Sequence, residues 1–218
     1  MNNLWTFGDS FSTSFKDNPF FLIGKYIEYK GYIPKIYSEI IAEKLKMDLK
    51  IYSEPGRDNY TIFESICSVS NEISDNDIII IQWSSFNRFR FVNEQNEWIS
   101  IFPNLYPNHP PFNNPGKFPL SEKHIFDKIG LNRIDHEKKY SDEVNNWMLL
   151  INKSFINNKI IYWTPFESSL INALYFKDID TVSKETNGKI SDKHYSEDGH
   201  KKLANIFLDI MNREKNLI

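Results

Sequence analysis

The sequence predicts an α/β protein, a three-layer α/β/α sandwich in which helices cover both faces of a doubly wound, mainly parallel sheet. Three observations indicate this fold class. Short apolar runs alternate with amphipathic segments along most of the chain, and each of four strand-like runs precedes a segment with helical spacing. The run over residues 78–81 contains only isoleucine, which is typical of a strand buried on both faces of a parallel sheet.

The four expected strands lie near residues 4–7, 49–53, 77–82 and 159–163. The expected helices cover residues 34–47, 58–73, 141–155 and 196–211, where apolar side chains recur every three or four positions. Gly8, Pro55 and Pro165 follow the first, second and fourth strands and favour turns there. Either Asp58 or Asn59 is placed to cap the second helix, because its side-chain oxygen can accept an N–H of the first turn.

We predict a single domain over residues 1–218, with an insertion at about 84–140 that breaks the alternation of strands and helices. Six of the ten prolines lie between residues 103 and 119, which favours extended or turn structure there. The insertion also holds several aromatic residues, which indicates a packed segment rather than disorder. Since long loops in compact domains are often functional, we expect this one to line the ligand site and to set specificity.

Composition and charge exclude several classes of protein. Apolar residues make up 40% of the chain and charged residues 25%, as in ordinary globular proteins. The formal charge of −3 gives no long-range attraction for nucleic acid or a membrane surface. No signal segment or membrane-spanning run is visible, so we expect a cytoplasmic protein. The single cysteine, Cys67, cannot form an internal disulfide, and we expect it to be a small buried residue of the second helix.

Polar residues and a turn glycine lie where a binding site is expected in such a fold. In a doubly wound sheet, ligands bind at the carboxyl ends of the strands. One serine follows the first strand, a glycine follows the second, three polar side chains follow the third, and an Asp-x-His sequence precedes the last helix. These residues are Ser10, Gly56, Ser84, Ser85, Asn87, Asp192 and His194.

Three short blocks of the sequence carry a recognisable pattern. They are Gly8-Asp9-Ser10 near the N-terminus, the turn glycine Gly56, and Asp192-Lys193-His194 before the last helix. In this order they resemble the blocks of the SGNH, or GDSL-type, hydrolase superfamily, and the resemblance covers nearly the whole chain. It implies a flavodoxin-like SGNH hydrolase fold. Two blocks depart from the family: residues 83–88 replace its Gly-x-Asn-Asp, and its usual Asp-x-x-His is one residue shorter here.

The chemistry of ester cleavage gives each of these residues a role. A serine hydroxyl is a poor nucleophile until a base takes its proton, so Ser10 needs the imidazole of His194. Asp192 is placed to hold the other ring nitrogen and to stabilise the cation. The oxyanion would be bound by the backbone N–H groups of Ser10 and Gly56, with Asn87 as the leading side-chain donor and Ser85 as its rival.

We therefore predict a serine esterase that cleaves a carboxylic ester, either short-chain or O-acetyl, through an acyl-enzyme on Ser10. The expected partner is a small-molecule or carbohydrate ester, and we expect neither a metal nor another cofactor. Two alternatives stay open. One is an acyltransferase with the same triad. The other is a binding or scaffold protein that kept the fold and lost activity, which the departure of residues 83–88 from the family's Gly-x-Asn-Asp block would favour.

Three further residues have competing interpretations. Asp198 rivals Asp192 as the acid, although an acidic residue in the first turn of a helix is also favoured by the helix dipole. His200, in the same turn, is expected to be structural. Arg88 is either a salt-bridge partner or a contact to an anionic group of the substrate.

Overall fold

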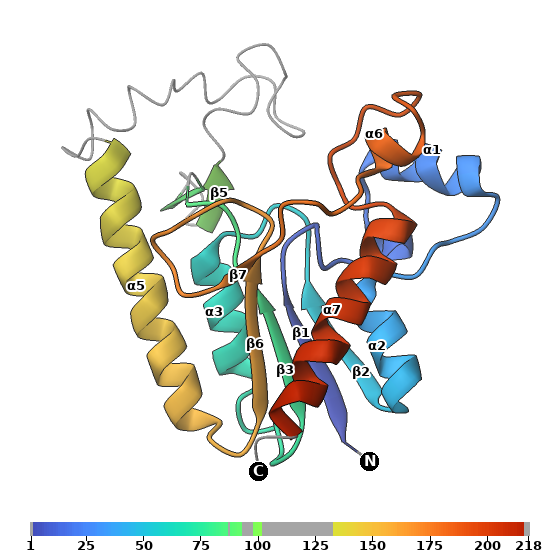
Figure 1. Ribbon diagram of the computed structural model, residues 1–218. Coiled ribbons are helices and arrows are strands. Elements are labelled where there is room, and N and C mark those ends of the chain that lie inside the picture. Colours follow the sequence, from blue (N-terminus) through green and yellow to red (C-terminus); the bar gives the residue numbers. More distant parts are fainter. Residues whose placement is uncertain (1, 87, 93–97, 102–132, 216–218) are drawn as a thin grey trace.

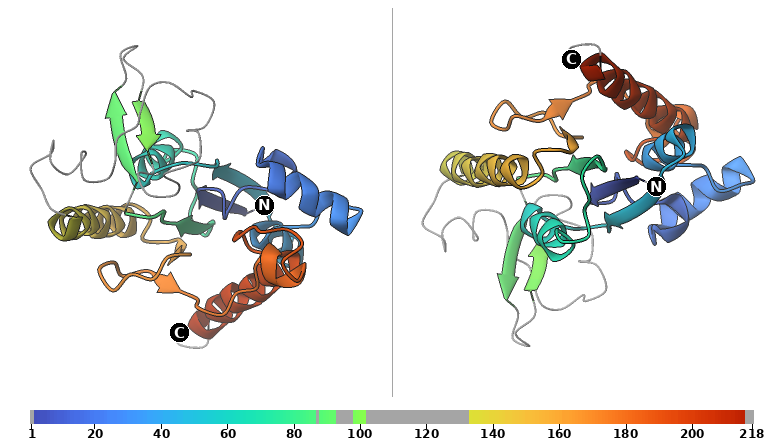
Figure 2. Two further views of the ribbon diagram at one scale, coloured as in Figure 1. Left: turned by 90° about the horizontal axis from the view of Figure 1, so that it is seen from above. Right: turned by 90° about the horizontal axis from the view of Figure 1, so that it is seen from below.

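The computed structural model describes residues 2–86, 88–92, 98–101 and 133–215 (Figure 1). It confirms the predicted three-layer α/β/α sandwich. Helices α3 (Asn59–Ser68) and α5 (Arg133–Ser154) cover one face of a five-stranded sheet, while α2 (Tyr37–Leu45) and α7 (Glu197–Lys215) cover the other. The views along the strands in Figure 2 show the two helix pairs on opposite sides of the twisted sheet.

The central sheet is parallel throughout, in the order β2-β1-β3-β6-β7. Its strands are β1 (Asn3–Gly8), β2 (Asp48–Ser53), β3 (Ile78–Gln82), β6 (Lys159–Thr164) and β7 (Leu174–Tyr175). The chain runs from β1 outward to β2 and then back across β1 to β3, so the strand order reverses beside β1. This reversal makes the carboxyl ends of β1 and β3 the expected place for a ligand.

Alternation along the strands builds the two halves of the core. In β3, Ile79 and Ile81 face α3 and α5, whereas Ile80 faces α2 and α7, and all three are fully buried. The β-branched side chains suit a pleated surface covered on both sides. Trp5 of β1 belongs to the half of the core under α3 and α5, and Trp163 of β6 belongs to the half under α2 and α7.

The four predicted strands agree with the structure to within about one residue. Several elements add to the prediction: α1 (Phe21–Lys30), α6 (Val182–Glu185), the 3-10 turn η1 (Phe15–Asp17), the short strand β7, and an antiparallel hairpin of β4 (Phe89–Val92) and β5 (Trp98–Ile101) within the insertion. Asp58 is the residue that caps α3, accepting the Thr61 N–H at 2.8 Å. The proline-rich part of the insertion lies outside the described residues.

Three predictions need correction. Helix α5 begins at Arg133, before the predicted start at residue 141, and α3 ends at Ser68 rather than near 73. The prediction of a buried Cys67 is wrong, because its side chain is exposed. On α3 the buried residues are Asn59, Ile62 and Ile66, and Cys67, the residue after Ile66, points away from the sheet.

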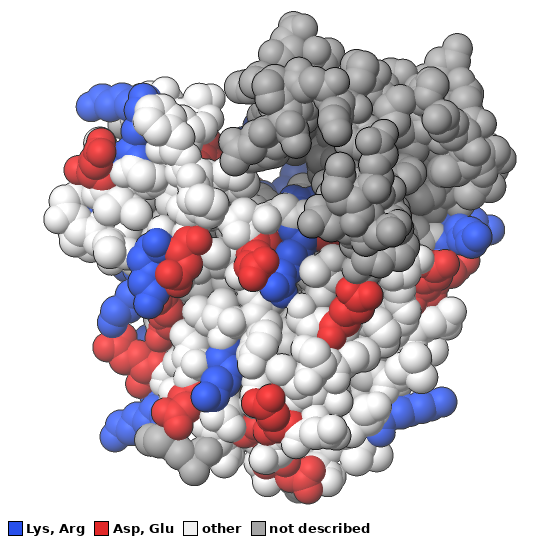
Figure 3. Space-filling view, turned by 180° about the vertical axis from the view of Figure 1, so that it is seen from behind, with Lys and Arg blue, Asp and Glu red and all other residues white. Residues whose placement is uncertain are grey.

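Within the described ranges, no helix is both long enough and apolar enough to cross a membrane. Acidic and basic side chains are interspersed over the face drawn in Figure 3, in keeping with the small net charge of −3.

Candidate active site

The loops that follow β1, β2 and β3 meet at one edge of the sheet, because the three strands are parallel neighbours. Ser10 lies in the first of these loops, Gly56 in the second and Ser85 in the third. Ser10 is only 7% exposed and Ser85 only 8% exposed. Asn87 lies outside the described residues, so its part in the oxyanion hole stays a prediction.

Asp192 and His194 are in contact. The Asp192 Oδ1 atom lies 2.6 Å from His194 Nδ1 and also accepts the backbone N–H of His194 at 2.9 Å. The second hydrogen bond closes a tight turn, which returns the carboxylate to the ring although the Asp-x-His spacing is short. The rival acid, Asp198, has a side chain that is 64% exposed and lies 3.4 Å from Lys201.

The environment of Asp192 favours its charged form. Burial alone would raise the pKa of Asp192, but the hydrogen bond and charge of His194, together with nearby backbone N–H groups, outweigh burial and lower that pKa below its ordinary value. At neutral pH this carboxylate is therefore ionised and can stabilise a positive charge on the imidazole.

The ring of His194 packs against the loop that carries Ser10. Its centroid lies 5.0 Å from that of Phe11, the residue after Ser10, and 5.4 Å from that of Phe20. Phe11 also contacts Phe166 and Tyr195 edge to face. The fold thus brings together two segments from opposite ends of the chain, with an aromatic cluster around the predicted base.

The turn before Ser10 is held by hydrogen bonds to Asp9. The Asp9 N–H donates to Gln82 Oε1 at 3.0 Å, and the Asp9 carboxylate accepts the Phe11 N–H at 3.1 Å. The Asp9 carbonyl accepts the Ser12 N–H at 3.0 Å. Gln82 ends β3, so the turn that carries Ser10 is tied to the neighbouring strand.

The loop after β3 is fixed by two side chains from elsewhere. Ser84 Oγ donates to Asp9 Oδ2 at 2.8 Å, which uses its one proton. The Asn59 side chain accepts the Ser84 N–H at 2.6 Å and donates to the Ser84 carbonyl at 3.2 Å. The sequence does not indicate that Asn59 and Gln82 support these loops. An amide at the end of a strand or the start of a helix has no local pattern that distinguishes it from other polar residues at such positions.

Gly56 has the backbone conformation that its turn requires. Its φ of +89° lies in the left-handed region, which a residue with a side chain rarely adopts. An added Cβ would meet nothing within 4 Å, so the conformation, and not close packing, explains the glycine.

The segment that carries Asp192 and His194 is anchored at both ends. The Val182 N–H donates to the His194 carbonyl, and the Ser183 N–H to the Asp192 carbonyl, each at 2.9 Å. Lys30 of α1 lies 3.0 Å from Glu185, before the segment, and 2.6 Å from Glu197, after it. The segment is thus hydrogen-bonded to α6, and its flanking residues Glu185 and Glu197 pair with α1.

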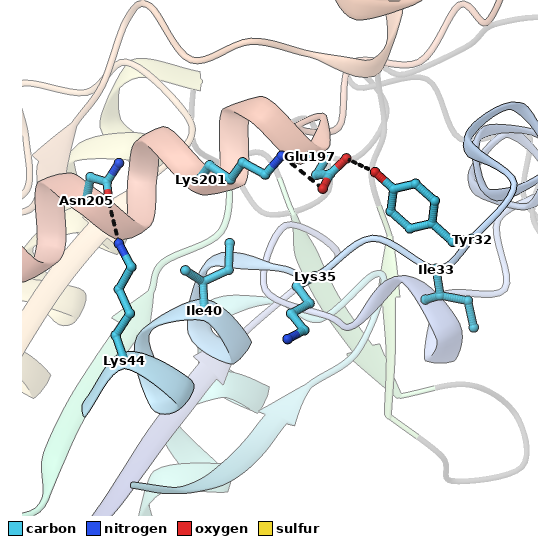
Figure 4. A pocket seen from close by; sticks show the side chains of 8 residues that line it. All are labelled: Tyr32, Ile33, Lys35, Ile40, Lys44, Glu197, Lys201 and Asn205. Atoms are coloured by element: carbon cyan, nitrogen blue, oxygen red, sulfur yellow. Dashed lines mark hydrogen bonds and ion pairs between the residues drawn. The ribbon is translucent and has the colours of Figure 1, made fainter. Parts of the chain in front are cut away.

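A hollow of about 450 Å³ lies between α2 and the start of α7 (Figure 4). Glu197 forms its polar wall, where it accepts the Tyr32 hydroxyl at 2.6 Å and pairs with Lys201 at 3.0 Å. The other lining residues are Ile33, Lys35, Ile40, Lys44 and Asn205. The predicted triad does not line this hollow.

Comparison with known proteins supports the fold. No protein-family model and no curated protein sequence matches the chain. Among solved structures, an acetyl xylan esterase from the rumen bacterium Butyrivibrio proteoclasticus is similar, with a TM-score of 0.53 and 12% identity. The match covers 100% of this chain and 65% of that protein, so the chain spans somewhat less than two thirds of its length. The chain thus shares its fold with an esterase, in agreement with the resemblance of its sequence blocks to the SGNH hydrolase superfamily.

Proposed function

We propose that the protein is a serine esterase that cleaves short-chain or O-acetyl carboxylic esters through an acyl-enzyme on Ser10. The observation that carries this proposal is the 2.6 Å contact between Asp192 and His194, on a ring that packs against Phe11 next to Ser10. With Nδ1 held by an ionised carboxylate, Nε2 is the ring nitrogen left for proton transfer.

The reaction takes two steps. Ser10 Oγ attacks the acyl carbon while His194 takes the hydroxyl proton, and the bond to the alcohol oxygen breaks as His194 gives that proton to it. Water then attacks the acyl-enzyme with His194 as base, and Ser10 leaves as the proton returns to its oxygen. The products are a carboxylic acid and an alcohol, and Asp192 stabilises the imidazolium in both steps.

The tetrahedral oxygen needs donors that are in place before the reaction. We assign this role to the backbone N–H groups of Ser10 and Gly56. The Ser84 hydroxyl already donates to Asp9, so the side-chain donor falls to Asn87 or Ser85.

The surroundings of His194 favour a small, uncharged acyl group. The rings of Phe11, Phe20 and Phe166 supply apolar surface beside the reacting groups. The structural neighbour is an acetyl xylan esterase, which supports acetyl as the acyl group and a carbohydrate as the alcohol.

Covalent labelling tests the proposal directly. A fluorophosphonate should modify the wild-type protein on Ser10, as located by peptide mass spectrometry, and acetate should be released from an acetylated xylo-oligosaccharide. Ser10→Ala should lose both activities. Ser14→Ala is the matched control, because it removes a buried hydroxyl from the same loop, hydrogen-bonded to Glu39, and should keep both. A wild-type protein that is not labelled, or that is labelled elsewhere, would refute the serine mechanism.

A further inference from the structure

Arg88, in the loop between β3 and β4, contacts both of the other loops at this edge of the sheet. Its Nη2 atom lies 3.4 Å from Asp9 Oδ2, and its Nη1 donates to the Arg57 carbonyl at 2.8 Å. Asp9 precedes Ser10, and Arg57 follows Gly56. One planar guanidinium therefore joins the turn of the proposed nucleophile to the turn of the proposed oxyanion donor.

This ion pair is shielded from water. The Asp9 side chain is fully buried and that of Arg88 is 10% exposed. A buried carboxylate is costly unless donors surround it, and among the described residues the Phe11 N–H, the Ser84 hydroxyl and the Arg88 guanidinium contact that of Asp9. Removing the guanidinium would leave Asp9 short of a partner and would also free the Arg57 carbonyl.

We propose that Arg88 is a positioning residue, which keeps the Ser10 turn and the Gly56 turn at a fixed separation through Asp9 and the Arg57 carbonyl. This inference rests on the proposed esterase function. An oxyanion hole built from N–H groups on two separate loops works only if both are held at the reacting oxygen beforehand. The guanidinium contacts both loops, beside the backbone hydrogen bond from the Glu54 N–H to the Gly8 carbonyl at 3.4 Å, so its loss should alter their relative position without removing any reacting atom.

Kinetics separate this role from substrate binding. Arg88→Met should lower both kcat for a neutral acetyl ester and the rate of fluorophosphonate labelling by about 10²-fold, since small misplacements of reacting groups have effects of that order. KM should change little. Arg88→Lys keeps the charge beside Asp9 but cannot span both acceptors, so its rates should lie between those of Arg88→Met and wild type.

Asp77→Asn is the matched control. Asp77 is as buried as Asp9 but lies at the amino end of the sheet, where it accepts the Asn3 N–H at 2.7 Å and the Trp5 indole N–H at 2.8 Å. Its substitution should lower thermal stability and leave the labelling rate of the folded protein unchanged. A general loss of stability is thereby distinguished from displaced loops.

Hydrogen exchange followed by mass spectrometry gives a readout that does not depend on activity. In Arg88→Met, exchange should accelerate together in peptides covering residues 8–13 and 53–58, and Asp77→Asn should not show this paired change. Three results would each overturn the positioning role. Both Arg88 variants could be labelled as fast as wild type, exchange could accelerate in only one of the two turns, or KM could change for anionic esters alone. If the wild-type protein is not labelled on Ser10, the esterase proposal fails, while the exchange experiment still decides whether Arg88 couples the two turns.

Discussion

The buried ring of His200 accepts the backbone N–H of Tyr37 at Nδ1, at a distance of 3.3 Å, and so joins the first turn of α7 to that of α2. The ring is 3% exposed and packs between Phe15 and Tyr37. An imidazole that accepts at Nδ1 in such a place must be neutral. Burial, assisted by the nearby charge of His194, lowers the pKa of His200 to about 3. The expectation that His200 is structural agrees with this arrangement.

His200 should therefore make folding stability depend on pH. In the unfolded chain its pKa is about 6.5, so below that pH the unfolded state binds a proton that the folded state does not. The free energy of unfolding should fall as the pH drops from about 6.5 towards 3, with a contribution of up to about 1.4 kcal/mol per pH unit. Above pH 6.5 the imidazole is neutral in both states, so its protonation no longer changes the free energy of unfolding.

Urea unfolding at several pH values between about 4 and 7 checks this prediction. His200→Asn is the comparison, because an amide oxygen can accept the Tyr37 N–H and does not titrate. The free energy of unfolding of the variant should change less steeply with pH, because its unfolding takes up about one proton fewer. Parallel curves for the two proteins would show that His200 does not contribute.

Asp192→Asn tests which carboxylate serves His194. The amide keeps the shape of the side chain but loses the charge that stabilises the imidazolium, so kcat should fall by on the order of 10³–10⁴. Asp198→Asn removes an exposed carboxylate from the first turn of α7 and should leave kcat unchanged. The measurement is kcat on one acetyl ester, with folding checked by circular dichroism. The opposite pattern, with only Asp198→Asn impaired, would transfer the role to Asp198.

The regular part of the fold could be predicted from sequence because its signals are local. Ile79, Ile80 and Ile81 belong to a continuous apolar run, as expected for a strand covered on both faces. Helix α1 was missed because its apolar pattern is thin: Ile23 and Tyr26 are buried, but Phe21 on the same helix is 74% exposed. Strand β7 is too short for any periodicity to show.

The residues proposed to react could be named from sequence, whereas most of the residues that contact their loops could not. Few residue types can act as nucleophile, base and orienting acid, so the motifs around Ser10 and His194 indicate the chemistry by themselves. The partners of Arg88 depend on how three loops approach one another in space, which no local pattern records. The same holds for Asn59, whose amide contacts the backbone of Ser84 on a different loop.

Gly8 should not tolerate a side chain. A Cβ at this position would lie 2.7 Å from Gln82 Oε1 and 2.9 Å from Gln82 Cβ, so Gln82 and the Asp9 N–H that it accepts must shift. Gly8→Ala should lower the free energy of unfolding by about 1–3 kcal/mol, as overpacking of a close-packed site does. It should also slow fluorophosphonate labelling, because the displaced turn carries Ser10.

Gly24→Ala is the matched control for Gly8→Ala. Gly24 lies within α1, where an added Cβ would meet nothing within 4 Å. Alanine should stabilise this helix by about 0.5–1 kcal/mol and leave labelling unchanged. Chemical denaturation of the three proteins gives the comparison, and equal stability of Gly8→Ala and wild type would contradict the close contact with Gln82.

The side-chain donor of the proposed oxyanion hole can be identified by comparing three substitutions in the loop after β3. An amide offers two donors on a planar group, so Asn87 remains the leading candidate and Ser85 its rival. Losing one such donor typically lowers kcat by on the order of 10²–10³. Asn87→Ala should show this loss with little change in KM or in thermal stability, because the donor acts only once charge develops on the oxygen.

Ser84→Ala should behave differently from Asn87→Ala. The Ser84 hydroxyl donates to the buried Asp9 carboxylate at 2.8 Å, so its removal should lower stability as well as kcat. Measuring kcat, KM and the melting temperature for Asn87→Ala, Ser85→Ala and Ser84→Ala separates the two roles. A loss of kcat without loss of stability in Ser85→Ala alone would move the donor to Ser85. Near-normal kcat in both Asn87→Ala and Ser85→Ala would leave the hole to the backbone N–H groups of Ser10 and Gly56.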